Sequence, residues 1–446
     1  MRESHPEEKK LGMEFYSTDC MGTGGKLKTR FEDFLVEEIL PDQTALSFED
    51  WKEVPTNDLQ ISGKYTRFVS FTLQKMGIST MAVSTILASS LNLPRNLITY
   101  AGLKDKRAIT VQRMSAPSRV VSLLGNLNLS NVEIRDFAYS RHPIQIGDLW
   151  GNRFTIILKN LETNVDDAFP IVETIRTTPI LNYFGVQRFG LSRPGTHTAG
   201  KSLIKRDFES VVKTVLTTPS DFESEELRTA REQLSEDLTP TEHIIEVFPK
   251  DLNYERAIMT ELMKHPGDFE RAVLRTEPRV LTLMVHAYQS YLFNRILSER
   301  VRNGMSIVEP EPGDFLIALD VPHSGRDSWL FVTEFSLEER QEQVRARDFG
   351  LALPVPGYST RIPPTKQSEL LKRVLDEEGI SLLNFRNPKV KALDSPGGLH
   401  LTAIQVPDMS ASGFPNGFKV QFSLRKGSYA TVVMRELMKN HPLNRI

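Results

Sequence analysis

The hydrophobic pattern of this chain changes its period several times within the first 160 residues. Residues 34–39 (FLVEEI) are strand-like, and residues 79–91 carry a helical pattern that Ser79 caps and Pro94 ends. Residues 152–161 are rich in β-branched and aromatic side chains, which favour a strand. We therefore expect a chain that mixes strands with helices. Its 446 residues are enough for two or three domains with hydrophobic cores.

The second half of the chain shows the same mixture. A helical pattern over residues 280–302 is followed by Asn303-Gly304, a typical helix stop. A strand pattern starts near residue 418, and Ser428 is expected to cap a final helix that runs to about residue 440. The sequence shows no internal repeat and no low-complexity tract.

Composition and cysteine content exclude several classes of protein. Apolar residues make up 39% of the chain, and no apolar run approaches the roughly 18 residues that span a bilayer. The first twelve residues lack the apolar core of a secretory signal, and Cys20 is the only cysteine. We therefore expect a cytoplasmic protein without a membrane contact. No two histidines stand at H-x-x-x-H spacing, so we expect no metal site.

The charges nearly cancel, but they are segregated along the chain. Residues 221–246 hold nine acidic residues against two arginines, whereas residues 104–119 hold five basic residues against Asp105. From residue 419 to the end, six basic residues stand against Glu436 alone. Such a chain can present a basic face to nucleic-acid phosphates while its net charge is -2. Scattered solvated charges would give the same counts, so both interpretations stay open.

The most pointed local pattern is YAGLKDKRAITVQ at residues 100–112. It places one carboxylate, Asp105, among Lys104, Lys106 and Arg107, between two β-prone segments, so these four residues should lie on a turn. Opposite charges within about 4 to 6 Å favour the ionised form of a carboxylate. From these residues alone, Asp105 is a nucleophile, a general base or one half of a structural salt bridge.

Residues 195–202 (GTHTAGKS) match the phosphate-loop pattern G-x-x-x-x-G-K-[ST] at every position. In a nucleotide-hydrolysing protein Lys201 would contact the phosphates, and Asp320 could hold Mg²⁺ at the end of the apolar run 315–319. The residues before Gly195, RFGLSRP, do not form the buried strand that a phosphate loop must follow. We expect an ordinary loop that enters a helix, with the NTPase kept as an alternative.

Five segments of the chain resemble, in order, the TruD family of tRNA pseudouridine synthases. They are KTRFEDFLVEE at 28–38, YAGLKDKRAITVQ at 100–112, GNRFTIIL at 151–158, NYFGVQRFG at 182–190 and GSYATVVMREL at 427–437. The GxKD and NYFGxQRFG elements are the most specific of these. The resemblance spans most of the chain.

The resemblance implies a mixed α/β (α+β) fold. A pseudouridine synthase domain with a curved, mainly antiparallel sheet would comprise residues 1–182 and 400–446. Residues 183–399 would form an inserted α/β TRUD domain, with a size similar to that of the archaeal or eukaryotic branch. The two ends of the chain would then meet in one domain.

The resemblance also implies an activity. The family converts a tRNA uridine, typically uridine 13 in the D arm, to pseudouridine by detaching the base, rotating it and rejoining it through carbon. It needs no cofactor and no metal. By resemblance Asp105 is the catalytic aspartate, and Lys28, Asn152 and Phe154 support the active site and bind the base. Asp105 could attack the nucleotide or remove a ribose proton, and the residues leave both steps open.

The resemblance makes tRNA the expected partner. Lys104, Lys106 and Arg107 are the expected phosphate contacts. We expect no nucleotide cofactor and no obligate protein partner. A non-catalytic RNA-binding protein with the same basic faces remains a second alternative, and it would tolerate replacement of Asp105.

Overall fold

The structure, a computed structural model, describes residues 1–51, 60–190, 193, 195–220, 222–320 and 328–445. The chain divides into two compact units, which are described separately. The sheet unit contains Ser17–Ile180, Ala318–Ser328 and Ile404–Ile446, and the helical unit contains Met1–Tyr16, Leu181–Ile317 and Trp329–Ala403. Among the described residues, every helix is too short or too polar to cross a membrane.

A ten-stranded, mainly antiparallel sheet forms the sheet unit, as the resemblance implied. Its strand order is β17-β18-β10-β4-β8-β6-β9-β5, and β3 and β7 add to β10 and β8. Among its described strands, only β4 with β8 and β5 with β9 pair in parallel. The strands are β3 (Gly24–Lys26), β4 (Phe34–Ile39), β5 (Ile61–Ser62), β6 (Phe68–Met76), β7 (Thr99–Tyr100), β8 (Ile109–Pro117), β9 (Val132–Ser140), β10 (Gly151–Leu161), β17 (Ser410–Phe414) and β18 (Gly417–Arg425).

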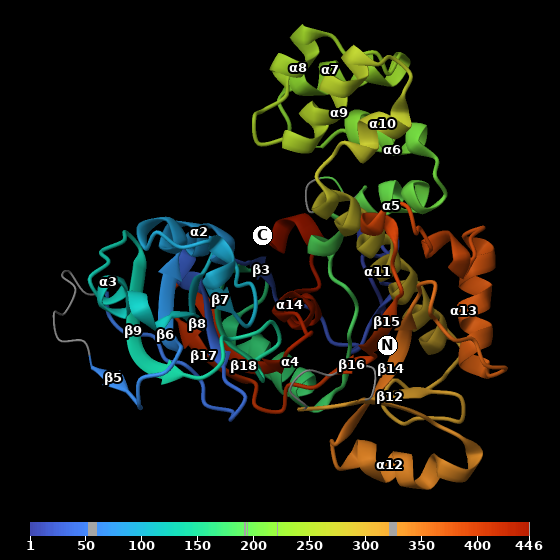
Figure 1. Ribbon diagram of the computed structural model, residues 1–446. Helices are drawn as coiled ribbons and strands as arrows, with labels where there is room; N and C mark the ends of the chain where they lie inside the picture. The colour runs from blue at the N-terminus through green and yellow to red at the C-terminus, as the bar shows by residue number, and fades with distance from the viewer. Residues whose placement is uncertain (52–59, 191–192, 194, 221, 321–327, 446) are drawn as a thin grey trace. The chain divides into compact units, whose positions relative to one another are not determined.

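Strands from residues 24–161 and from residues 410–425 build this sheet together. Strand β18, red in Figure 1, pairs antiparallel with β10 from Gly151↔Arg425 to Lys159↔Gly417, and β10 pairs on its other side with β4. Phe418, Val420 and Phe422 of β18 are fully buried, because alternate residues of a strand point to one face. The C-terminal strand is therefore part of the core.

One face of the sheet is apolar at both ends and polar in the middle. At one end α4 (Val165–Thr177) and α14 (Ala430–Met438) cover Val36 and Phe154, and at the other α2 (Thr80–Ser90) covers Phe71 and Leu73. Strand registers place four further side chains on this face between the two apolar clusters. These buried polar side chains are Glu38, Lys75, Thr110 and Gln112.

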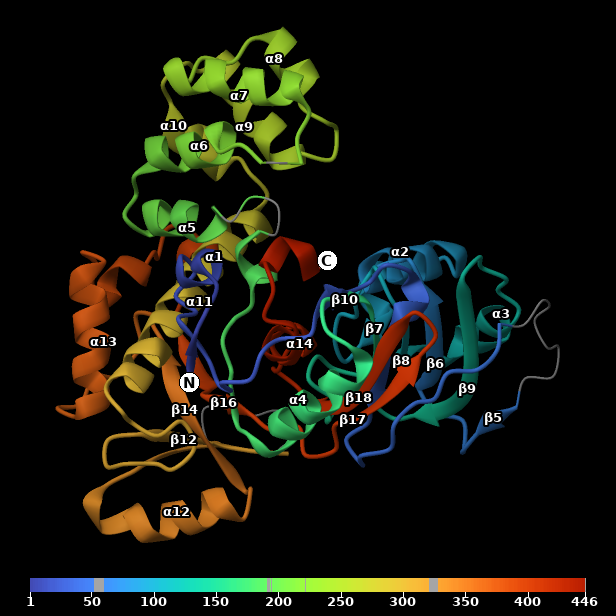
Figure 2. The same cartoon turned by 180° about the vertical axis from the view of Figure 1, so that it is seen from behind.

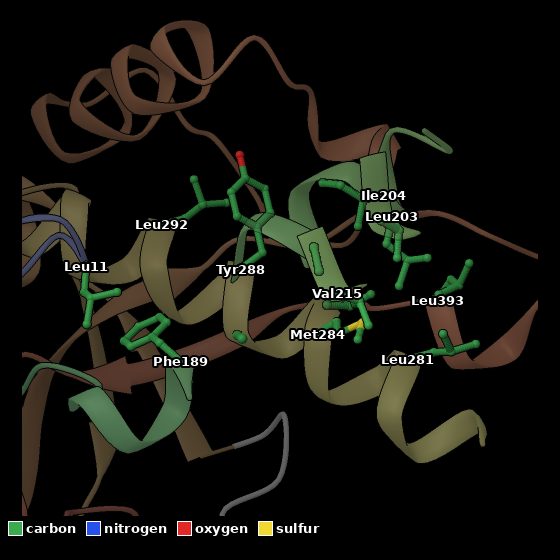
Figure 3. Close-up of a cluster of buried hydrophobic side chains, with 14 of the residues drawn as sticks. Leu11, Phe189, Leu203, Ile204, Val215, Leu281, Met284, Tyr288, Leu292 and Leu393 are labelled. Carbon is green, nitrogen blue, oxygen red and sulfur yellow. The ribbon is translucent and has the colours of Figure 1, made fainter. Parts of the chain in front are cut away.

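Helices dominate the helical unit, and α11 runs through its core. Figure 3 shows Met284, Tyr288 and Leu292 of α11 in a buried cluster that also contains Leu203 of α5. The helical unit also contains a four-stranded sheet with the strand order β13-β12-β14-β15. The main elements are α5 (Thr196–Ile204), α6 (Phe208–Thr217), α7 (Glu225–Glu236), α8 (Glu242–Val247), α9 (Asn253–Lys264), α10 (Phe269–Leu274), α11 (Pro278–Arg302), β12 (Phe315–Ala318), β13 (Trp329–Phe331), α12 (Leu337–Arg345), β14 (Phe349–Val355), α13 (Lys366–Glu377) and β15 (Gly398–Leu401).

The segment that matched the phosphate-loop pattern is a helix. Gly195 is the N-cap of α5, and the next seven residues lie within the helix rather than in a loop. A Cβ on Gly200 would lie 2.0 Å from the carbonyl oxygen of Met284, so this glycine permits the close approach of α5 to α11. The ammonium of Lys201 donates to Glu378 at 2.7 Å. Gly200 thus serves helix packing, Lys201 is paired with Glu378, and the loop that the NTPase alternative requires is a helix here, so that alternative is wrong.

Two further expectations differ from the structure. Tyr429, not Ser428, holds the N-cap position of α14, and no side chain caps this helix end. The first sixteen residues lie in the helical unit, although we expected them in the sheet domain. They lie there because Leu11 packs in the core around α11, and its carbonyl oxygen accepts a hydrogen bond from Asn294 Nδ2. Figure 2 shows this blue N-terminal segment beside α11.

Candidate active site

Asp105 lies in the loop between β7 and β8, with its side chain 39% exposed. The ammonium of Lys28 lies 2.7 Å from Asp105 Oδ1, and the Lys28 side chain is 6% exposed. The two residues form an ion pair in which the carboxylate remains open to solvent on one side. An exposed carboxylate next to a buried, fixed cation can act on a substrate that arrives from outside.

Lys28 holds an unusual backbone conformation. Its φ is 53°, in the left-handed region, which costs a non-glycine residue on the order of 1 kcal/mol. The ammonium also lies 4.2 Å from the centre of the Phe34 ring, where the electron-rich face of the ring attracts a cation. The ion pair with Asp105 and the ring contact both hold the side chain in this place.

Buried contacts anchor the Asp105 loop from beneath. Lys104 Nζ lies 2.6 Å from Glu38 Oε2, and these side chains are 3% and 0% exposed. The backbone N–H of Lys104 donates to Thr80 Oγ1 at 3.0 Å, and the backbone N–H of Arg113 donates to Glu38 Oε1 at 2.9 Å. The cation at one oxygen of Glu38 and the N–H at the other offset part of the cost of burying this carboxylate.

A third buried lysine touches the same loop. Lys75 is fully buried, and its ammonium donates to the backbone carbonyl oxygens of Asp105 at 2.9 Å and of Ile78 at 2.8 Å. Burial lowers the pKa of Lys75 to about 8, the charge of Asp105 opposes that shift, and the charge of Lys104 adds to it.

Phe154 and Asn152 are two residues apart on β10, so their side chains point to the same face of the sheet. The Phe154 ring is centred 6.1 Å from that of Phe34 and 5.7 Å from that of Phe422, and the residue is 6% exposed. Asn152 pairs in register with Glu38, and its Oδ1 is buried without a hydrogen-bond partner among the described residues. A base could therefore contact the Phe154 ring only through the small part of the ring that is exposed.

The structure brings the four expected site residues together. Lys28 contacts Asp105 directly, Phe154 is linked to Lys28 through the ring of Phe34, and Asn152 lies beside Glu38, the partner of Lys104.

The expected phosphate contacts divide into two kinds. Lys106 and Arg107 are exposed beside Asp105 and are free to meet a phosphate. Lys104 is not, because its ammonium is buried against Glu38, and we withdraw it as a phosphate contact. Lys439 of the basic C-terminal segment is also buried, with its ammonium donating to the carbonyl oxygens of Thr18 and Cys20.

Sequence reasoning missed Glu38 and Lys75. Both stand on the buried face of an alternating strand, Glu38 after Phe34 and Val36, and Lys75 after Leu73. A charged residue in step with apolar ones is the pattern that could have found them, because a buried charge requires a partner.

Within the described residues, no three His, Cys, Asp or Glu side chains come together in a way that could hold a metal ion.

The sequence and the fold are similar to those of one group of known proteins. The family model for tRNA pseudouridine synthase D (TruD) matches residues 10–437. A relative from Methanosarcina barkeri, named "Probable tRNA pseudouridine synthase D", is 32% identical over 98% of each chain. One with the same name from Methanopyrus kandleri is 34% identical over 82% of this chain and 84% of its own. A crystal structure from Methanosarcina mazei, assigned to tRNA pseudouridine synthase D (TruD), matches with a TM-score of 0.78 at 29% identity and 98% coverage of each chain.

Proposed function

Because the chain belongs to the tRNA pseudouridine synthase D (TruD) family, we propose that it isomerises uridine 13 of tRNA to pseudouridine with Asp105 as the catalytic carboxylate. The observation that carries this proposal is the pair of Lys28 and Asp105, in which a buried cation fixes a carboxylate that solvent can reach. We place the activity in the cytoplasm, where its tRNA substrate is found.

The reaction breaks the bond between N1 of the uracil and C1′ of the ribose and forms a bond between C5 and C1′. The C5 proton leaves and N1 gains a proton, so the substrate and product have equal mass. Asp105 either attacks the nucleotide or removes a ribose proton, and both roles need an ionised carboxylate. Lys28 would orient it in either case.

The target base must leave its stack before Asp105 can reach the ribose. We propose that Phe154 and Asn152 support the surface that receives the base. Phe154 packs against the ring of Phe34, and Asn152 pairs in register with Glu38. Contact between a base and an aromatic side chain contributes about 1 to 3 kcal/mol.

Lys106 and Arg107 are the proposed phosphate contacts beside the site. Each contact with a phosphate releases counterions, so replacing either residue by Gln should lower the slope of log Kd against log salt by about 1. Titrations of labelled tRNA at several salt concentrations measure this slope. An unchanged slope in both variants would remove these residues from the RNA-binding surface.

The experiment that tests the function uses unmodified tRNA transcripts. Wild-type protein is incubated with a transcript that carries uridine at position 13 and with a matched transcript that carries cytidine there. Pseudouridine is mapped by chemical derivatisation, since the mass does not change. We expect product at position 13 of the first transcript and none in the second. Product at another uridine in both transcripts would overturn the proposed position.

A further inference from the structure

The ammonium of Lys75 has a different kind of partner from those of the other two lysines of the site. Lys28 pairs with Asp105 and Lys104 pairs with Glu38, each at hydrogen-bond distance. The ammonium of Lys75 donates instead to two backbone carbonyl oxygens. Burying an ammonium is costly when no carboxylate touches it, so a role in the folded state alone would favour an apolar residue at this position.

The two carbonyl groups that Lys75 binds belong to the segments around the reactive carboxylate. One is the carbonyl of Asp105 itself, and the other is that of Ile78, just before α2. Lys75 is on β6, in register with Thr110 of β8, so the ammonium reaches from a central strand of the sheet into the loop. The contact fixes the peptide group of Asp105 relative to the sheet.

We propose that Lys75 is a positioning residue for catalysis, which holds the Asp105 backbone and supplies a second positive charge behind its carboxylate. The inference rests on the proposed function. Lys75 acts through Asp105 and does not touch the RNA, because it is fully buried.

The charge of Lys75 should appear in the pH dependence of turnover. The groups that face it are Asp105, which favours the charged ammonium, and Lys104, which disfavours it, while Lys28 and Glu38 are engaged with those two. With a pKa of about 8, Lys75 loses its proton above that pH. We therefore expect kcat of the wild type to fall as the pH rises through about 8.

Lys439 offers a control for the loss of a buried ammonium elsewhere in the sheet unit. It is a second buried lysine of the sheet unit: its ammonium donates to the backbone carbonyl oxygens of Thr18 and Cys20 and also lies 3.4 Å from Glu436 Oε1. Lys75→Met and Lys439→Met both remove a buried ammonium that binds two backbone carbonyl groups. Lys439→Met also removes the ion pair with Glu436, whereas Lys75→Met removes the hydrogen bond to the Asp105 backbone.

The experiment compares wild type, Lys75→Met, Lys75→Arg and Lys439→Met for kcat, tRNA affinity, melting temperature and pH profile. We expect Lys75→Met to lower kcat by about 100-fold, as for a misplaced catalytic group, with tRNA affinity unchanged. Lys439→Met should keep the wild-type kcat per folded molecule. Lys75→Arg, which stays charged, should retain more activity than Lys75→Met and lack the alkaline fall.

Two results would overturn the inference. One is a wild-type kcat in Lys75→Met, and the other is a loss that Lys439→Met shows equally when both are corrected for folded protein. If Lys75→Met does not fold, the pH profiles of wild type and Lys75→Arg decide, and an alkaline fall common to both contradicts the role. Wild-type protein without any product would instead refute the proposed function, so the two failures are distinct.

Discussion

Lys28 and Asp105 stand 77 residues apart in the sequence, and their side chains meet at 2.7 Å. The lysine follows the short strand β3 and the aspartate precedes β8, so the sheet unit must be folded before the pair can form. The lysine is buried and the aspartate is partly open to solvent. This asymmetry is what lets the carboxylate act on a substrate while its orientation is held from within.

Replacing Lys28 by Met should therefore affect turnover more than stability. The pair contributes about 1 kcal/mol or less to stability because the Asp105 side chain is well exposed. A freed carboxylate samples other orientations, and we expect kcat to fall by about 100-fold. Turnover assays and thermal melts of Lys28→Met measure the two effects. A wild-type kcat in a folded variant would show that the lysine does not orient Asp105.

Replacing Lys104 by Met should reduce the stability of the fold more than turnover. It leaves the carboxylate of Glu38 buried without its cation, which costs about 3 to 5 kcal/mol of unfolding free energy. The double variant Glu38→Gln/Lys104→Met removes the unpaired charge and should recover much of that loss. Urea unfolding compares the two. A single variant as stable as the double variant would contradict the account of this buried pair.

Phe154 is best tested with a substitution that preserves its buried volume. Phe154→Ala would cost about 3 to 5 kcal/mol and confuse folding with function. Phe154→Leu should cost less than about 1.5 kcal/mol, lower turnover and leave tRNA affinity nearly unchanged. Phe422→Leu is the matched control, because its ring packs against Phe154 and is fully buried. Equal turnover in the two variants would argue against a role for Phe154 in receiving the base.

The buried ammonium of Lys75 predicts a pH dependence of stability. Its pKa is lowered from 10.5 to about 8, so between these values the unfolded chain binds a proton that the folded chain does not. The free energy of unfolding then rises with pH across this window, by about 3 kcal/mol from this group. Below pH 8 the full cost of the buried charge is present.

Urea unfolding of wild type and Lys75→Met from pH 7 to pH 10 isolates this effect. The stability of wild type relative to the variant should increase with pH through the window. A difference that stays constant would show that Lys75 is not buried as a charged group near neutral pH.

Local patterns in the sequence predicted much of the fold. The strand over residues 34–39 and the helix after Ser79 are present with those bounds, since alternation and an N-cap act between near neighbours. The Ser79 side chain accepts from the N–H of Ala82 at 3.1 Å. Ser428 is not the cap because α14 begins at Ala430, which places Tyr429 at the N-cap position.

Contacts between distant segments were less predictable. The turn that carries Asp105 was visible in the sequence, but whether Lys104 faces solvent or Glu38 depends on how β4 lies against that turn. The sequence did not predict the partner of Lys201 either, because Glu378 lies 177 residues further along the chain. A pattern match names residue types, whereas burial and partner decide whether a lysine meets a phosphate or a carboxylate.

The most direct test of the account compares wild type with Asp105→Asn on unmodified tRNA transcripts, with folding and tRNA affinity measured for both. Asn keeps the size of the side chain and removes its charge. The account predicts pseudouridine with the wild type and none with an Asp105→Asn variant that folds and binds tRNA. Product formed by that variant at the wild-type rate would contradict the central claim, and the catalytic role would have to be assigned to another residue.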